Sequence, residues 1–198
     1  MEKITRFADI PQFTRDGSYS ADYPIDRLVT FIEDEQREDG LQLNPDFQRG
    51  HVWTEDQQIA YVEFLLKGGK TGRMIYLNCP SWRHPVQEGA YNDFVVVDGL
   101  QRITALSRFF HNEIKVFGSY FSEYTDKIRC IRDTIRVNIN DLKTKKEVLQ
   151  WYVDMNAGGT PHSAEEIQRV RAMIAEEDDW ESWECRKMQE IKATSSLG

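Results

Sequence analysis

Apolar residues recur every three or four positions in two stretches of the first third of the chain, a spacing typical of amphipathic helices. The first stretch follows Pro24, a residue suited to an opening helical turn, and ends at Gly40. The second follows Thr54, which forms a capping-box pattern with Gln57, and it ends at Gly68-Gly69. The pattern therefore predicts two helices, separated by a loop that contains proline and glycine.

Strands and helices alternate in the middle of the chain. Residues 73–79 have the pattern of a strand, and residues 93–97 form an apolar run that predicts a strand covered on both faces. Residues 102–112 carry apolar side chains on one helical face. Residues 128–140 alternate Ile and Val with polar residues, which predicts one bent strand or two short strands, and residues 143–155 have a helical pattern.

The two ends of the chain carry weaker signals. Residues 1–23 contain few periodic apolar positions and are expected to form an N-terminal arm. Ser163 and Glu166 repeat the capping-box pattern before a further helix, and residues 176–198 are expected to form a last polar helix and a tail. We therefore expect one globular α+β domain over residues 24–175, with a helical C-terminal third.

Composition narrows the class of protein. The 198 residues are 40% hydrophobic, which suffices for one core. The net charge of -8 argues against a general nucleic-acid coat, because Lys and Arg supply most affinity for phosphate backbones, although a local basic patch stays open. Cys79, Cys130 and Cys185 are far apart, which argues against a disulfide framework or a zinc site. With no leader and no apolar run of roughly 20 residues, we expect a cytoplasmic protein with no membrane partner.

The segment VVVDGLQRITALSRFF, residues 95–110, gathers polar chemistry where a predicted strand meets a predicted helix. A helix start has N–H groups without partners and partial positive charge, so it is a natural seat for phosphate. Gly99 would let the backbone approach a ligand closely, and Arg102 adds a planar fork of donors. Asp98 could hold a metal, orient Arg102 or cap the helix, and the sequence leaves these three roles open.

Four motifs follow one another along the chain. They are Asn44–Arg49 with Trp53, the capped helix that ends at Gly68-Gly69, Val97–Leu106, and Asn156–Pro161 before Glu166-Ile167. This series resembles the DGQQR-motif domains, relatives of ParB and sulfiredoxin that occur at the N-terminus of GmrSD-type modification-dependent restriction enzymes. The resemblance covers residues 24–173 and implies a compact ParB/sulfiredoxin-like mixed sheet with flanking helices.

The resemblance also implies a ligand. It places a nucleoside triphosphate of unidentified base against Gly99 and Arg102, with Gln101 beside them. Mg²⁺, if used, would be carried largely by the phosphates, with Asp98 as the single protein carboxylate. Leu100 departs from the family, which usually has glutamine there, so one polar arm is expected to be missing. Sulfiredoxins have their reactive cysteine at this position, so the leucine excludes peroxiredoxin repair.

Two further segments belong to the site that the resemblance implies. Gln48 and Arg49 would bring a second cation to the same phosphates, or Arg49 would instead pair with Asp46 or Glu55 within the loop. Gly159 lies in a glycine turn that would either close over the nucleotide or only link two helices. These residues complete the expected nucleotide site.

Three functions remain open at the level of sequence. The first is a nucleoside triphosphatase of a restriction or phage-conflict system, with Asp98 and Arg102 as catalytic residues. The second is a binding module that senses a nucleotide or modified DNA and regulates a partner protein. The third is a metal-dependent nuclease, which has the weakest support because two-metal catalysis needs several converging carboxylates.

Overall fold

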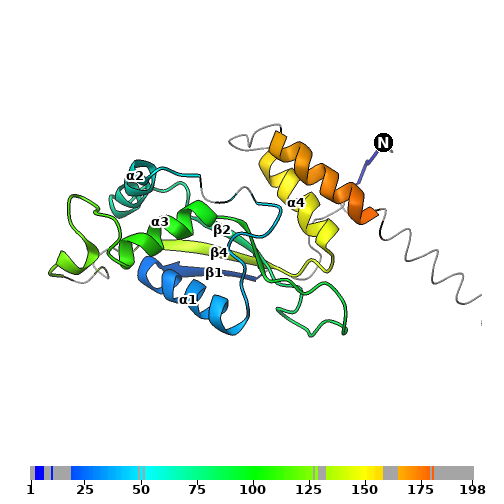
Figure 1. Ribbon diagram of the computed structural model, residues 1–198, viewed down its shortest axis with the longest axis horizontal. Helices are drawn as coiled ribbons and strands as arrows, with labels where there is room; N and C mark the ends of the chain where they lie inside the picture. Colours follow the sequence, from blue (N-terminus) through cyan, green and yellow to red (C-terminus); the bar gives the residue numbers. More distant parts are fainter. Residues whose placement is uncertain are drawn as a thin grey trace, which may run out of the picture. The chain divides into compact units, whose positions relative to one another are not determined.

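The computed structural model describes residues 3–6, 10, 19–48, 50, 52–126, 128, 133–157, 165–178 and 180. The chain divides into two compact units, Met1–Lys143 and Thr144–Gly198 (Figure 1). Within the described residues, no helix combines the length and the apolar character that are needed to cross a membrane.

A four-stranded mixed sheet forms the centre of the first unit. Its strands lie in the order β1 (Tyr19–Pro24), β4 (Thr134–Asn140), β2 (Met74–Asn78) and β3 (Val95–Asp98). β4 pairs antiparallel with β1 and parallel with β2, while β2 pairs antiparallel with β3. Gln42 forms a further parallel bridge to Val95, and its N–H donates to the Phe94 oxygen at 2.8 Å. The segment after the first helix therefore extends the sheet beyond β3.

Three helices of the first unit contribute apolar side chains to one core with the sheet. They are α1 (Ile25–Glu38), α2 (Glu55–Leu66) and α3 (Leu100–Phe110), and the short 3-10 helix η2 (Phe121–Glu123) follows α3. α3 lies between α1 and α2 and packs against both (Figure 1). The core includes Leu28, Ile32, Val62, Leu65, Ile75, Leu77, Ile103, Leu106, Val137 and Ile139. The helical spacing of three and four residues and the strand spacing of two bring these side chains to a common interior.

The second unit contains α4 (Lys145–Ala157) and a helical segment over residues 165–178. Buried Tyr152 donates its hydroxyl to Oε1 of Glu166 at 2.7 Å, which joins the two helices in their interior. An ion pair between Lys146 and Asp178 joins them again on the exposed side. Glu166 is thus a buried contact between helices. The capping box expected with Ser163 lies outside the described residues.

The α+β class and the mixed sheet predicted from the sequence are confirmed. The expected strand at 128–140 is β4, which begins at Thr134. Residues 19–23, expected to belong to an arm, instead form most of β1. They do so because their side chains alternate in exposure against β4, and the carboxylate of Asp22 accepts from Arg136 at 2.9 Å. The boundary between the two compact units falls after Lys143.

Candidate functional site

The chain turns sharply where β3 ends and α3 begins. Asp98 is the last residue of β3, and Gly99 precedes α3 with a φ of 122°, a conformation that favours glycine. A Cβ atom at this position would lie 2.9 Å from Cγ1 of Ile75 in β2. The sequence suggested that Gly99 makes room for a ligand. In the structure, it makes room for Ile75, so glycine is needed to close the core at this turn.

Asp98 and Arg102 form an ion pair across this turn. Nη2 of Arg102 lies 2.6 Å from Oδ2 of Asp98, and the two side chains are 19% and 46% exposed. Of the three roles left open for Asp98, the structure shows the orientation of Arg102. It does not show a cap, because α3 begins without a side-chain cap hydrogen bond. No acidic residue occupies the first turn of α3 either, so its N–H groups keep their positive character.

Gln101 ties the preceding loop to the start of α3. Its Oε1 atom accepts the backbone N–H groups of Val52 and Trp53, both at 3.0 Å, and its Nε2 atom donates to the Gly50 oxygen at 2.8 Å. Three of the four hydrogen bonds that an amide side chain can make are therefore used within the protein. Gln101 thus positions the loop that contains Gly50, Val52 and Trp53.

Gln48 ties the other end of the same loop to β3. Its Nε2 atom donates to the Val96 oxygen at 2.5 Å and lies 3.4 Å from the Val97 oxygen. Arg49, expected to supply the second cation, lies outside the described residues, but both of its neighbours are anchored at the junction of β3 and α3. Gly159, the other expected ligand contact, also lies outside the described residues.

Trp53, just before α2, and Tyr61 of α2 form an aromatic contact. The rings of Trp53 and Tyr61 lie 5.3 Å apart, and the Tyr61 hydroxyl donates to the Gly72 oxygen at 2.8 Å. Burial raises the pKa of Tyr61 well above its usual range, while the positive charges of Arg102 and Arg73 oppose that rise. α2, which carries Tyr61, packs against α3, which carries Arg102. Sequence reasoning missed this arrangement because no local pattern links the two helices.

Arg108 fastens α3 to the start of α2. Its guanidinium donates to Oε1 of Gln58 at 2.8 Å and to Oε2 of Glu55 at 3.0 Å, and it also contacts Glu113. These carboxylates raise the pKa of Arg108 above its usual value, with the hydrogen bond to Glu55 as the main cause. Glu55, one expected partner of Arg49, is thus engaged by Arg108. These bonds tie α3 to α2.

Leu100 points into the core and is only 7% exposed. A side chain at this position therefore lies in the core. The resemblance to the family suggested instead that a polar side chain here would reach a ligand. Leucine suits the site because it packs with Ile103 and Leu106 of the same helix in one cluster. In the described part of the chain, no group of three or more His, Cys, Asp or Glu residues could hold a metal ion.

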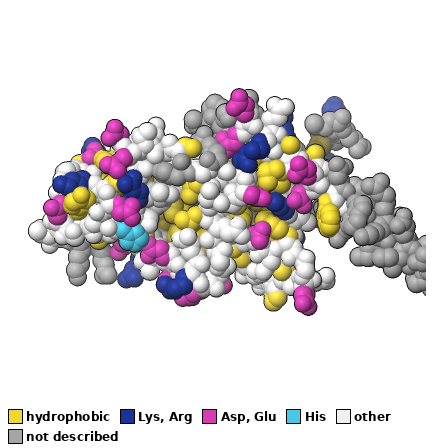
Figure 2. Space-filling model, in the orientation of Figure 1, with side chains coloured by type: hydrophobic (Ala, Val, Ile, Leu, Met, Phe, Trp, Pro, Cys, Tyr) yellow, Lys and Arg dark blue, Asp and Glu magenta, His cyan; other side chains and the backbone are white. Residues whose placement is uncertain are grey.

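Charged side chains of both signs share the surface of the protein. On the face shown in Figure 2, Lys and Arg lie among Asp and Glu and do not gather into one broad area. A net charge of -8 accompanies this distribution. Any attraction of phosphate on the displayed face must therefore be local.

A family model described as the N-terminal domain of the GmrSD restriction endonuclease matches residues 28–134. The matched segment runs from α1 to the first residue of β4, so it contains the whole junction of β3 and α3 and more than half of the chain. No curated protein and no solved structure matches the chain. The match confirms the resemblance predicted from the order of the motifs. This chain therefore belongs to the family of GmrSD restriction endonuclease N-terminal domains, a family of DNA restriction systems.

Proposed function

We propose that this chain binds a nucleoside triphosphate at the start of α3, where Arg102 and the N–H groups of the first turn would hold phosphate oxygens. One observation carries the proposal: the start of α3 has no side-chain cap and adjoins Arg102, whose side chain is only 19% exposed. Phosphate there would gain charge-assisted hydrogen bonds and the favourable end of the helix dipole. Family membership supports a role in a restriction or phage-conflict system that acts on or near DNA.

Asp98 determines which form of the nucleotide suits the site. Its carboxylate holds Arg102 and would repel a phosphate group placed beside it. Mg²⁺ bound to the phosphates would remove that repulsion, and Asp98 has the oxygen ligands that Mg²⁺ prefers. Arg102 would then be released to contact the phosphates. The ion pair therefore favours a magnesium nucleotide over a free one.

The surrounding residues take two kinds of role in this proposal. Gln48 and Gln101 are positioning residues, because their amides hold both ends of the loop that contains Arg49. Arg49 would add a second cation at the phosphates.

Hydrolysis is the further step of the proposal. Arg102 would neutralise charge that develops during phosphoryl transfer, and Asp98 would hold Mg²⁺ or orient a water molecule. The ion pair between these residues also favours a second candidate, a nucleotide or modified-DNA sensor without turnover. If Arg102 leaves Asp98 and binds a phosphate, the ion pair between β3 and α3 is broken. Ligand binding alone would then change the structure of the junction, without hydrolysis.

Calorimetric titration of the full chain with ATP, CTP, GTP and UTP, with and without Mg²⁺, tests the proposal. Arg102→Lys keeps the charge but loses the planar fork, so affinity should fall about tenfold or more. Arg136→Lys is the matched control because Arg136 also pairs with an aspartate, Asp22, on the β1–β4 edge. Unchanged affinity in Arg102→Lys, or no binding of any nucleotide, would overturn the proposal. Product analysis of each bound nucleotide then separates the enzyme from the sensor.

A further inference from the structure

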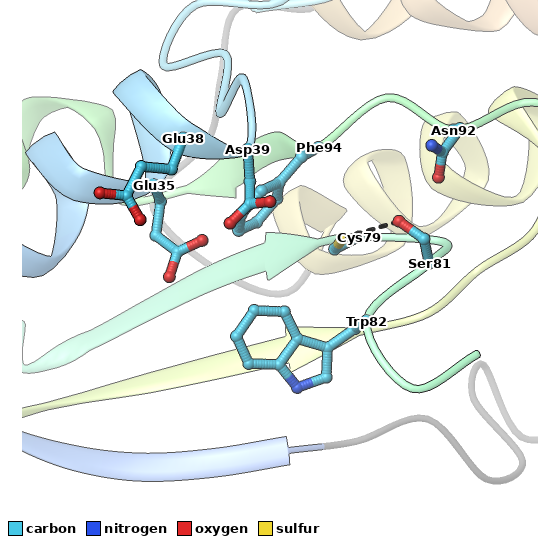
Figure 3. Close-up of a pocket in the computed structure, with 8 residues that line it drawn as sticks. All are labelled: Glu35, Glu38, Asp39, Cys79, Ser81, Trp82, Asn92 and Phe94. Atoms are coloured by element: carbon cyan, nitrogen blue, oxygen red, sulfur yellow. Dashed lines mark hydrogen bonds between the residues drawn. The ribbon is translucent and has the colours of Figure 1, made fainter. Parts of the chain in front are cut away.

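A cavity of about 440 Å³ lies at the opposite end of β3 from Asp98. It is lined by the end of α1, the segment that follows β2 and the residues that precede β3 (Figure 3). Its volume is within the range of small-molecule sites, roughly 300–1,000 Å³. The proposed nucleotide site makes no use of these residues, so the cavity needs an explanation of its own.

One side of the cavity is acidic, and its negative charges lie at the negative end of the α1 helix dipole. Glu35, Glu38 and Asp39 gather at the C-terminal end of α1, where the helix dipole is negative and cations are preferred. Arg37, the basic residue of this last turn, is bound to Asp34 at 2.6 Å and to Glu38 at 3.0 Å. Negative charge at Glu35 and Asp39 therefore adds to the negative helix end. A bound cation would relieve this repulsion.

Glu35 has an oxygen that is placed for a ligand. Its Oε2 atom is buried and makes no hydrogen bond. Figure 3 shows the Glu35 carboxylate pointing into the cavity, toward the side that Trp82 occupies. A buried carboxylate oxygen without a donor is costly, and a ligand with N–H groups would satisfy it.

The other side of the cavity is aromatic. Trp82 closes a turn that begins at Cys79, with its N–H donating to the Cys79 oxygen at 3.0 Å. Its ring packs 5.6 Å from that of Tyr19 and 6.2 Å from that of Phe94, which fixes its orientation. Aromatic faces attract desolvated organic cations, and guanidinium groups stack on them especially well. A strongly hydrated metal ion gains little from such a wall.

The thiol of Cys79 does not make the cavity reactive. Burial raises the pKa of Cys79, and its Sγ atom lies 3.6 Å from Oγ of Ser81. The protonated thiol is a poor nucleophile. The chemistry of this cavity is therefore that of binding.

We propose that this cavity binds an organic cation of the guanidinium type, with Glu35 and Asp39 as its anionic partners and Trp82 as its stacking surface. The planar fork of a guanidinium matches two carboxylate oxygens, and its flat face matches the indole. The cation is either a free small molecule or an arginine side chain of a polypeptide partner, because both offer the same group. This site is independent of the proposed nucleotide site.

NMR titration of the ¹⁵N-labelled full chain at constant ionic strength tests the proposal. The probes are butylguanidinium chloride, its neutral isostere butylurea, and blocked arginine amide as the side-chain source. We expect butylguanidinium to shift the signals around Glu35 and Trp82, and butylurea to leave them unchanged. Preference for the blocked arginine assigns the site to a polypeptide, and preference for butylguanidinium assigns it to a free molecule. Equal binding of butylurea overturns the proposal.

Variants separate a built site from general attraction to an acidic protein. Glu35→Gln should weaken butylguanidinium binding about tenfold, and Trp82→Ala about three- to tenfold. Glu88→Gln, an exposed acid outside the cavity lining, removes the same charge and should change affinity less than about twofold. Equal losses in Glu35→Gln and Glu88→Gln, or displacement of the probe by equimolar Mg²⁺, overturn the proposal.

The pH dependence of binding gives an independent readout. Burial, followed by the charge of Asp39, raises the pKa of Glu35 to about 7. Binding that needs the ionised carboxylate should strengthen up to about tenfold between pH 6 and pH 8. The charges of Glu38 and Asp34 also act on this carboxyl. The pKa values of Tyr23 and Cys79 are raised mainly by burial, and the charge of Glu35 contributes to both rises. A pH-independent affinity contradicts the role of Glu35.

Discussion

Arg102 donates from Nη2 to Oδ2 of Asp98 at 2.6 Å, and so joins the last residue of β3 to the first turn of α3. The pair has a helical spacing of four residues, but Asp98 lies outside the helix, so the bond spans the turn at Gly99. The guanidinium therefore stays at the helix start without an external ligand. Arg102 is thus already paired with a carboxylate that would compete with phosphate for its guanidinium.

Asp98→Asn should change nucleotide affinity in opposite directions with and without Mg²⁺. Without Mg²⁺, the variant should bind nucleoside triphosphate more tightly, by about three- to tenfold, because it loses a repulsive charge and frees Arg102. With Mg²⁺, it should bind about tenfold more weakly, since it loses a metal ligand. Calorimetry in EDTA and in Mg²⁺ measures both. A change of the same sign in both conditions would show that Asp98 is only structural.

Gln101→Ala should destabilise the fold through loss of the loop. Three backbone groups, at Gly50, Val52 and Trp53, lose their partner, and a loss of about 1–3 kcal/mol in the free energy of unfolding is expected. Denaturant unfolding measures this, with the exposed Gln36→Ala in α1 as the control, expected within about 0.5 kcal/mol of the wild type. If the free energies of unfolding of the two variants differ by less than about 0.5 kcal/mol, the hydrogen bonds of Gln101 do not stabilise the loop.

Local patterns in the sequence predicted the elements well because their causes are local. The capping box at Thr54 and Gln57 is present, with both reciprocal hydrogen bonds. The helical periodicity after Pro24 corresponds to α1, and the apolar run at 93–97 overlaps the buried strand β3. Each of these features depends on residues within a few positions of one another.

The contacts that build the site could not be read in the same way. The bonds of Gln48 and Gln101 join positions 48 to 51 residues apart, and no periodicity reports them. The sequence identified Gly99 as special but not that its neighbour is Ile75 of another strand. The sequence analysis also treated Leu100 as the loss of a polar side chain from the ligand site. The burial of this position could not be foreseen, because the direction of the side chain depends on how α3 packs against the sheet. Tertiary packing therefore decides these roles.

Gly99→Ala should be far more damaging than Gly40→Ala. Both glycines have positive φ, but a Cβ at Gly40 meets no atom within 4 Å, whereas a Cβ at Gly99 meets Ile75 at 2.9 Å. Backbone strain alone should cost Gly40→Ala about 1–2 kcal/mol. Overpacking should add about 1–3 kcal/mol at Gly99. Thermal and denaturant unfolding compare the two, and equal losses would contradict the close packing of the turn.

Glu35→Gln should raise stability at neutral pH and leave it nearly unchanged in acid. The pKa of Glu35 is raised from 4.5 to about 7 in the fold, mainly by burial. Between these two pH values, the folded state binds more protons than the unfolded chain. The protonated carboxyl therefore contributes to the free energy of unfolding below pH 4.5, and this contribution is lost as the pH rises to about 7. Glutamine cannot ionise, and the variant avoids that loss.

The expected rise is largest above pH 7, where the wild type carries an ionised carboxylate beside Asp39 at the negative end of α1. Removing an unfavourable charge at a helix end is worth about 0.3–1 kcal/mol, a rise of roughly 1–4 °C in melting temperature for a chain of this size. Melting curves at pH 5 and pH 8 measure the difference, with Glu88→Gln as the control for net charge. A stabilisation that is equal at both pH values, or shared by Glu88→Gln, would mean that Glu35 ionises freely. Because the same substitution is expected to weaken guanidinium binding, a variant that is more stable but binds less would show that the acidic end of α1 is kept at a cost in stability.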